Sequence, residues 1–128
     1  MPPKLSSRQQ AQLAFLERLP PKMQRMHSLI EQMGNVRVDE TIIRNFGRLL
    51  DEIKGNATAL SLNGLATTAG LMGTMLRRGG GLQLRVRGLR ELLASFKTNY
   101  EGAVRKASTP EDGAGDEGSA GEGEAAPA

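Results

Sequence analysis

Apolar side chains recur at spacings of three and four residues from about residue 10 to residue 106, and strand-like alternation is almost absent. This spacing places the apolar side chains on one face of an α-helix. Turn-forming residues divide the pattern into five segments. The pattern therefore predicts an all-α protein, an antiparallel up-down four-helix bundle with an extra N-terminal helix.

Local signals predict the limits of the first two helices. Ser6 or Ser7 can cap the first helix, which we expect to stop at Pro20-Pro21. Pro21 can open the second helix, because proline is tolerated in a first turn, and Gly34-Asn35 ends it. The expected apolar faces are Leu13, Phe15, Leu16 and Leu19 in the first helix, and Met23, Met26, Leu29, Ile30 and Met33 in the second.

The longest periodic segment follows Asp39, a good N-cap for a third helix. A break near residues 62–64 precedes a fourth helix, which Arg77-Arg78 and the turn at 79–81 close. A fifth helix is expected from about Leu82 to Lys106. The predicted apolar face of the third helix is Ile42, Ile43, Phe46, Leu49, Leu50, Ile53, Ala57 and Leu60, and that of the fourth is Leu65, Ala69, Met72, Met75 and Leu76.

The C-terminal residues differ in composition from the rest of the chain. Residues 108–128 contain no apolar side chain larger than alanine and proline, so ordering them would cost entropy without hydrophobic return. We expect a helical domain at 1–107 and a disordered, solubilising acidic tail at 108–128. The tail segment 111–128 holds six of the 14 acids and no lysine or arginine, which leaves residues 1–110 with a formal charge of +9.

Composition also argues against several classes of protein. The chain has no cysteine and one histidine, His27, so thiolate chemistry, disulfides and sites built from paired histidines are excluded. We expect no metal and no cofactor, and we do not expect an enzyme. No stretch has the length of a signal peptide or a membrane span, so we expect a cytoplasmic protein without a membrane partner.

Residues 50–57 (LDEIKGNA), followed by Leu60-Ser61-Leu62 and residues 65–69, resemble the histidine-containing phosphotransfer family. The similarity is greatest to the N-terminal phosphotransfer domains of chemotaxis histidine kinases. Those proteins carry a pattern like A-H-x-(L/I)-K-G-x-A and then an apolar-Gly-apolar step, and Lys54, Gly55 and Ala57 match it. The resemblance covers roughly residues 10–106, with specific matches only in this short part. The motif can also be aligned in a second register, with residues 59–64 at the motif positions. In that register no lysine stands at the position of the family's lysine.

Asp51 occupies the position of the family's phosphorylated histidine. A helix carboxylate without metal-binding acids beside it is a poor phosphoryl acceptor. The resemblance implies that the lysine would lie beside the phosphate and that the glycine would admit a receiver domain. We therefore expect a docking face at Arg48, Asp51, Glu52, Lys54 and Gly55 without catalytic residues, although the Asp51 charge could also imitate a phosphohistidine.

The resulting hypothesis is a degenerate phosphotransfer domain that binds a response-regulator receiver or a histidine kinase in bacterial two-component signalling. The alternative is a basic helical adaptor for nucleic acid or a structural protein. Few aromatic residues are available for base stacking, so nucleic acid is the weaker partner. The basic residues Arg77, Arg78, Arg85, Arg87 and Arg90 fit either a solvated face or a docking patch for an acidic protein. The methionines fit core filling or a groove for a partner helix.

Overall fold

The computed structural model describes residues 4–35, 40–78 and 81–111. They form five α-helices and no strand within these ranges. The helices are α1 (Ser7–Leu16), α2 (Leu19–Asn35), α3 (Glu40–Ala59), α4 (Asn63–Arg77) and α5 (Leu82–Ser108). The predicted all-α fold is confirmed.

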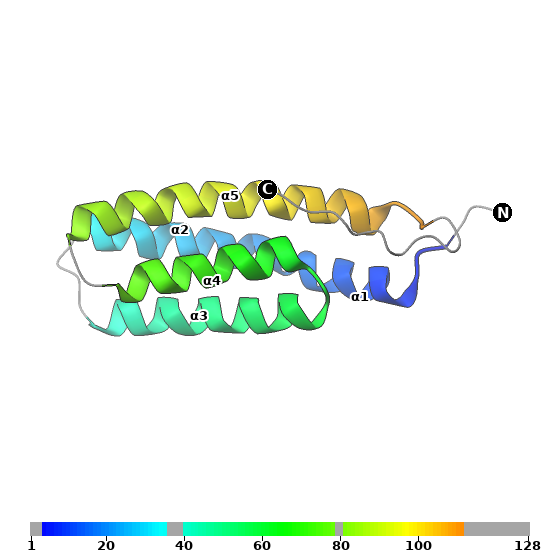
Figure 1. The fold of residues 1–128 in the computed structure, drawn as a ribbon, viewed down its shortest axis with the longest axis horizontal. Helices are drawn as coiled ribbons and strands as arrows, with labels where there is room; N and C mark the ends of the chain where they lie inside the picture. The colour runs from blue at the N-terminus through cyan, green and yellow to red at the C-terminus, as the bar shows by residue number, and fades with distance from the viewer. Residues whose placement is uncertain (1–3, 36–39, 79–80, 112–128) are drawn as a thin grey trace.

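Helices α2 to α5 run alternately up and down and form the bundle (Figure 1). Helix α4 packs between α3 and α5, and α2 packs against α5 and, less extensively, α3. Helix α5 is the longest, with 27 residues, and its C-terminal part extends beyond α2. Helix α1 contacts this part of α5, so α1 and α2 together cover the length of α5.

The core is built from the apolar faces that the sequence predicts. Phe46 and Phe96 are fully buried, at 0% exposure, and are the largest side chains in it. The core methionines Met23, Met26, Met33 and Met72 are likewise buried and fill the space between helices. Two residues predicted on the apolar face of the third helix, Ile42 near the start of α3 and Leu60 directly after its end, are only partly buried and pack against the cluster.

The boundary between the first two helices differs from the prediction. Helix α1 ends at Leu16, and Leu19, predicted in the first helix, is the fully buried first residue of α2. Pro20 and Pro21 thus lie in the first turn of α2 rather than at a break. The N–H groups of a first turn have no intrahelical acceptor, so two prolines there cost no backbone hydrogen bond. Helix α2 ends at Asn35, as Gly34-Asn35 predicts.

The turn between α3 and α4 has the geometry of a helix C-cap. Ser61 has a φ of 61°, in the left-handed region that favours glycine. The Leu62 N–H donates to the Ala57 carbonyl at 2.8 Å, and the Ser61 N–H donates to the Thr58 carbonyl at 3.1 Å. Such bonds satisfy carbonyls that the end of a helix leaves free. The predicted break near 62–64 is confirmed, with α4 beginning at Asn63.

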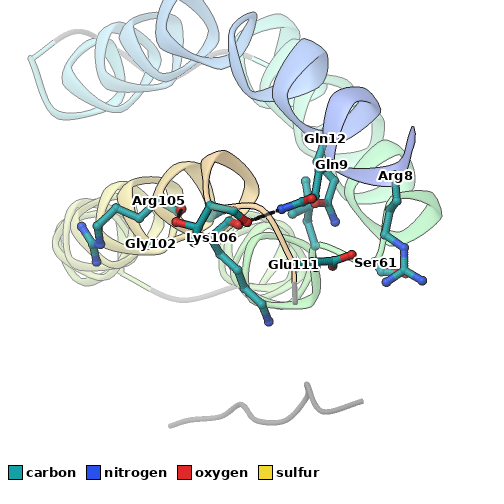
Figure 2. Close-up of a pocket in the computed structure, with 11 residues that line it drawn as sticks. Arg8, Gln9, Gln12, Ser61, Gly102, Arg105, Lys106 and Glu111 are labelled. Carbon is teal, nitrogen blue, oxygen red and sulfur yellow. Dashed lines mark hydrogen bonds between the residues drawn. The ribbon is translucent and has the colours of Figure 1, made fainter. Parts of the chain in front are cut away.

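Gln9 joins the two ends of the described chain. Its side chain is 2% exposed, and its Nε2 donates to the carbonyls of Thr109 at 2.6 Å and Lys106 at 3.3 Å (Figure 2). Gln9 also completes a capping box with Ser6 at the start of α1. One glutamine side chain therefore caps both the beginning of α1 and the end of α5.

We expect Gln9→Ala to lower the free energy of unfolding by about 1–3 kcal/mol, because carbonyls at the end of α5 lose their donor. Urea denaturation followed by circular dichroism measures this change. The control is Gln10→Ala, since Gln10 is exposed and its side chain donates to the Leu5 carbonyl, and we expect a loss within about 0.5 kcal/mol. Equal losses in the two variants would contradict the role of Gln9.

An ion pair between Arg90 and Glu31 connects α5 and α2. The Arg90 guanidinium donates from two nitrogens to the Glu31 carboxylate, at 3.0 and 3.1 Å. The hydrogen bonds from Arg90 hold the pKa of Glu31 below its ordinary value. The pair links the N-terminal half of α5 to the C-terminal half of α2 at the protein surface.

Some predicted features lie outside the described residues. These are the Asp39 cap, the first two glycines of the turn at 79–81 and the acidic tail from residue 112 onward. Gly81 is described and is the N-cap of α5. Helix α5 continues to Ser108, two residues beyond the predicted end at Lys106, so Ser108 belongs to the bundle and not to the tail.

Candidate protein-binding site on helices α3 and α4

The five residues of the expected docking face all lie on α3, in its middle and second half, and all are exposed to solvent: Arg48, Asp51, Glu52, Lys54 and Gly55. Their exposure follows from the helical period, because Leu50, Ile53 and Ala57 on the opposite face of α3 are buried in the core. The geometry on which the docking hypothesis depends, an acid and a lysine three residues later displayed on a helix, is present.

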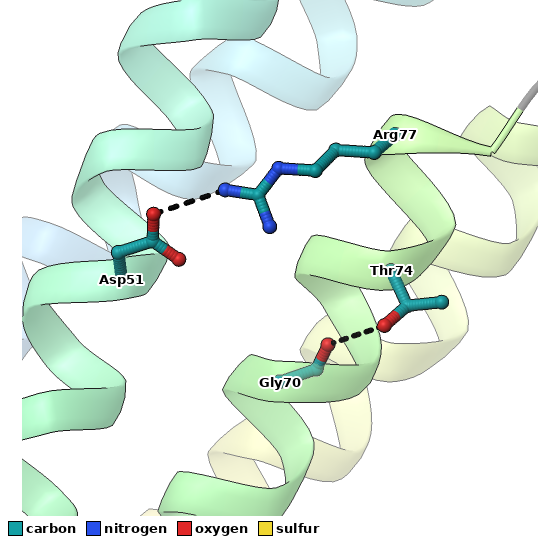
Figure 3. Close-up of polar contacts among 4 residues, drawn as sticks. All are labelled: Asp51, Gly70, Thr74 and Arg77. Atoms are coloured by element: carbon teal, nitrogen blue, oxygen red, sulfur yellow. Dashed lines mark hydrogen bonds and ion pairs between the residues drawn. The ribbon is translucent and has the colours of Figure 1, made fainter.

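Asp51 forms an ion pair with Arg77, from the last turn of α4. Arg77 donates through one terminal guanidinium nitrogen to Asp51 Oδ2 at 3.0 Å (Figure 3). Both side chains are more than half exposed, at 63% for Asp51 and 55% for Arg77. Such exposed pairs contribute little to stability, so the pair is available to exchange partners.

Glycines on both helices make room for the Arg77 guanidinium. A Cβ atom at Gly47 of α3 or at Gly73 of α4 would lie 3.3 Å from a terminal nitrogen of Arg77. Gly47 and Gly73 are both buried. The missing side chains let the guanidinium lie in the seam between α3 and α4 while it reaches Asp51.

Lys54 lies across the same seam one turn further along. A Cβ atom at Gly70 of α4 would contact the end of the Lys54 side chain, at 3.6 Å from Cε and 3.7 Å from Nζ. No ion pair is formed by Lys54 among the described residues. Gly55 is open, because a Cβ atom at this position would have no neighbour within 4 Å. The seam therefore presents one paired and one unpaired cation beside an uncovered stretch of helix.

Glu52 belongs to a different side of α3. Its carboxylate lies 3.5 Å from Lys22 Nζ of α2, and it lines a shallow hollow of about 510 Å³ formed with α1 and α2. Arg48 is exposed and forms no ion pair within the described ranges. The structure thus brings Asp51 and Lys54 together at the α3–α4 seam and leaves Glu52 outside it.

The docking face expected from the sequence does not include the residues that α4 adds to the seam. These are Arg77 and the glycines Gly70 and Gly73. From the sequence, Arg77 belongs only to a basic stretch, and Gly70 and Gly73 indicate close helix packing. The sequence does contain a signal that these three residues act together, because residues 70, 73 and 77 share one face of a helix at spacings of three and four. Spacing alone does not show which helix that face meets.

Another pocket lies at the end of the molecule that holds the α3–α4 turn. It has a volume of about 550 Å³ and lies between α1, the α3–α4 turn and the end of α5 (Figure 2). Arg8, Arg105 and Lys106 line it together with Glu111 and the satisfied amides of Gln9 and Gln12. It contains no residue of the α3–α4 seam.

No group of three or more histidine, cysteine, aspartate or glutamate side chains in 4–35, 40–78 and 81–111 could hold a metal ion. His27, the one histidine of the chain, is exposed on α2. Phe46 and Phe96 are buried, and the other two aromatic residues, Phe15 and Tyr100, are partly buried against the core. None of the helices in the described part of the chain is both long and apolar enough to cross a membrane.

Comparisons of the chain with protein-family models, with curated proteins and with solved structures found no match.

Proposed function

We propose that the protein is a degenerate phosphotransfer domain that binds a receiver domain or a histidine kinase through the α3–α4 seam and carries no phosphate. The observation behind the proposal is the exposed Asp51–Arg77 pair with Lys54 beside it and Gly55 open. Asp51 stands where the resembled family has its histidine. The seam offers cations to an acidic pocket, and a partner backbone can approach closely at Gly55.

The turn after α3 supports the same register of the resemblance. The family pattern has a glycine in the apolar-Gly-apolar step, and this chain has Ser61 there with a φ of 61°. Serine thus keeps a backbone conformation for which glycine is preferred. The second register would put residues 59–64 on the motif, and these residues comprise the end of α3, the turn and the start of α4 instead of the middle of a helix.

Binding to isolated receiver domains tests the proposal. The probes are the receiver domains and the histidine kinases encoded in the same genome, measured by calorimetry against the full chain at physiological salt. We expect Lys54→Glu to weaken binding of the cognate receiver at least about tenfold, because it places a like charge against an acidic pocket.

The control is Lys97→Glu, an exposed lysine on α5 that makes the same change in net charge away from the seam. We expect it to change affinity less than about twofold. The proposal is wrong if no receiver domain or histidine kinase binds, or if both variants weaken binding equally.

A further inference from the structure

A second surface lies between α4 and α5, on the side of α4 that faces away from the α3–α4 seam. It is a groove of about 410 Å³ lined by apolar side chains of Leu71 and Met75 from α4 and Leu92 from α5. Gly88 lies at its side, where a Cβ atom would approach Met75 Cε to 2.7 Å. The missing side chain at Gly88 lets the flexible thioether of Met75 lie against α5.

The two large hydrophobic side chains that are exposed in the described ranges are Leu71, at 52%, and Leu84, at 69%. Leu71 lines the groove. Leu84 lies one helical turn before Gly88 on the same face of α5 and extends the apolar surface toward the start of that helix. Exposed apolar surface that continues into a groove is typical of a binding site for another protein.

The structure also separates the five clustered arginines into two groups. Three are engaged within the molecule: Arg77 with Asp51, Arg90 with Glu31, and Arg85 with the Leu76 carbonyl at 3.2 Å. Arg78 and Arg87 are exposed, and neither forms an ion pair with any other described residue.

Of the two unengaged arginines, Arg78 lines the groove, and Arg87 lies on α5 directly before the lining residue Gly88. Arg78 lies at the end of α4, and Arg87 follows Leu84 by three residues at the start of α5. Glu91 lies further along and is the one acid in the described lining. The groove therefore has an apolar floor with the positive charge of Arg78 at the end near the α4–α5 turn and that of Arg87 beside the groove.

We infer that this groove binds an amphipathic helix of a partner protein, with leucine-type side chains between Leu71, Met75 and Leu92 and carboxylates over Arg78 and Arg87. Leu71 and Met75 are four residues apart on α4, about 6 Å along the helix axis, which matches two apolar anchors at i and i+4 of a partner helix. Acids are most favourable in the first turn of a helix, so the N-terminus of the partner helix lies at the arginine end. The acidic tail of this chain lacks large apolar side chains and does not fit the floor.

A labelled helical peptide of about four turns tests the inference. The probe has two glutamates in its first turn, leucines at i and i+4, and one lysine placed to meet Glu91. Fluorescence anisotropy measures its binding to the full chain, and amide chemical shifts map its position. We expect saturable binding, with the largest shifts in residues 71–78 and 84–92, and at least about tenfold weaker binding by Leu71→Asp and by Arg78→Glu.

Two controls separate this surface from the α3–α4 seam. We expect Lys54→Glu to leave peptide binding unchanged, and a peptide with lysines in place of the two glutamates to bind at least about tenfold more weakly. The inference is overturned if the peptide does not bind, if Leu71→Asp has no effect, or if the shifts map elsewhere. It is also overturned if the chain dimerises and Leu71→Asp makes it monomeric, because the groove would then hold a second copy.

Discussion

On the proposed function, Asp51→His is expected to be labelled close to stoichiometrically by a phosphorylated receiver domain, whereas the unsubstituted chain is expected to remain unlabelled. In the variant, an imidazole nitrogen attacks the phosphorus, a P–N bond forms, and the P–O bond to the receiver aspartate breaks to release its carboxylate. Lys54 and Arg77 then lie beside the developing charge on the phosphoryl oxygens. Transfer of radiolabel to the chain, resolved on a gel, measures the result.

The matched variant is Asp51→Asn, which also removes the Arg77 partner but supplies no nucleophile, and we expect it to remain unlabelled. The double variant Asp51→His with Lys54→Ala is expected to be labelled at least about tenfold more slowly. An unlabelled Asp51→His protein that folds and binds the receiver would contradict the proposed register. Stoichiometric labelling of the unsubstituted chain would contradict the proposal that the protein carries no phosphate.

Phe96→Ala is expected to have the largest effect on stability, lowering the free energy of unfolding by about 3–5 kcal/mol. Phe96 is fully buried in α5, where closely packed neighbours limit how far the bundle can collapse around the cavity. Domains of this size are stable by only about 5–15 kcal/mol, so the variant loses a large part of the total. Urea denaturation measures the loss, and we expect the slope of the unfolding free energy against urea concentration to be the same in both proteins.

The neighbouring position 98 provides the control. Thr98 is exposed on the same helix, and its hydroxyl donates to the Ala94 carbonyl one turn earlier. We expect Thr98→Ala to change stability by less than about 0.5 kcal/mol. A loss below about 1 kcal/mol for Phe96→Ala would show that the core repacks around this position, contrary to the burial of its side chain.

The helical pattern is sufficient to predict the fold because each helix has one apolar face. Leu50, Ile53 and Ala57 recur at helical spacing and are all buried. The predicted limit of the first helix is wrong because Pro20-Pro21 is compatible with both a helix end and a first turn. Choosing between them depends on the burial of Leu19 at the junction, which is a tertiary property.

The candidate site is predictable only in part. Exposure of Asp51 and Lys54 follows from the helical period, since their neighbours form the apolar face. The pairing of Asp51 with Arg77 spans 26 residues and depends on how α4 packs against α3. Sequence spacing within one helix contains no information on that contact.

For the proposed partner, the glycines beneath Lys54 and Arg77 would lower the entropic cost of binding and slow dissociation. A long cationic side chain in free solution has many rotamers, and fixing it in a complex costs up to about 2 kcal/mol. Gly47, Gly70 and Gly73 let both side chains rest along the seam in the unbound protein, so part of their freedom is already restricted. A partner that meets cations already arranged in this way loses less conformational freedom on binding and dissociates more slowly.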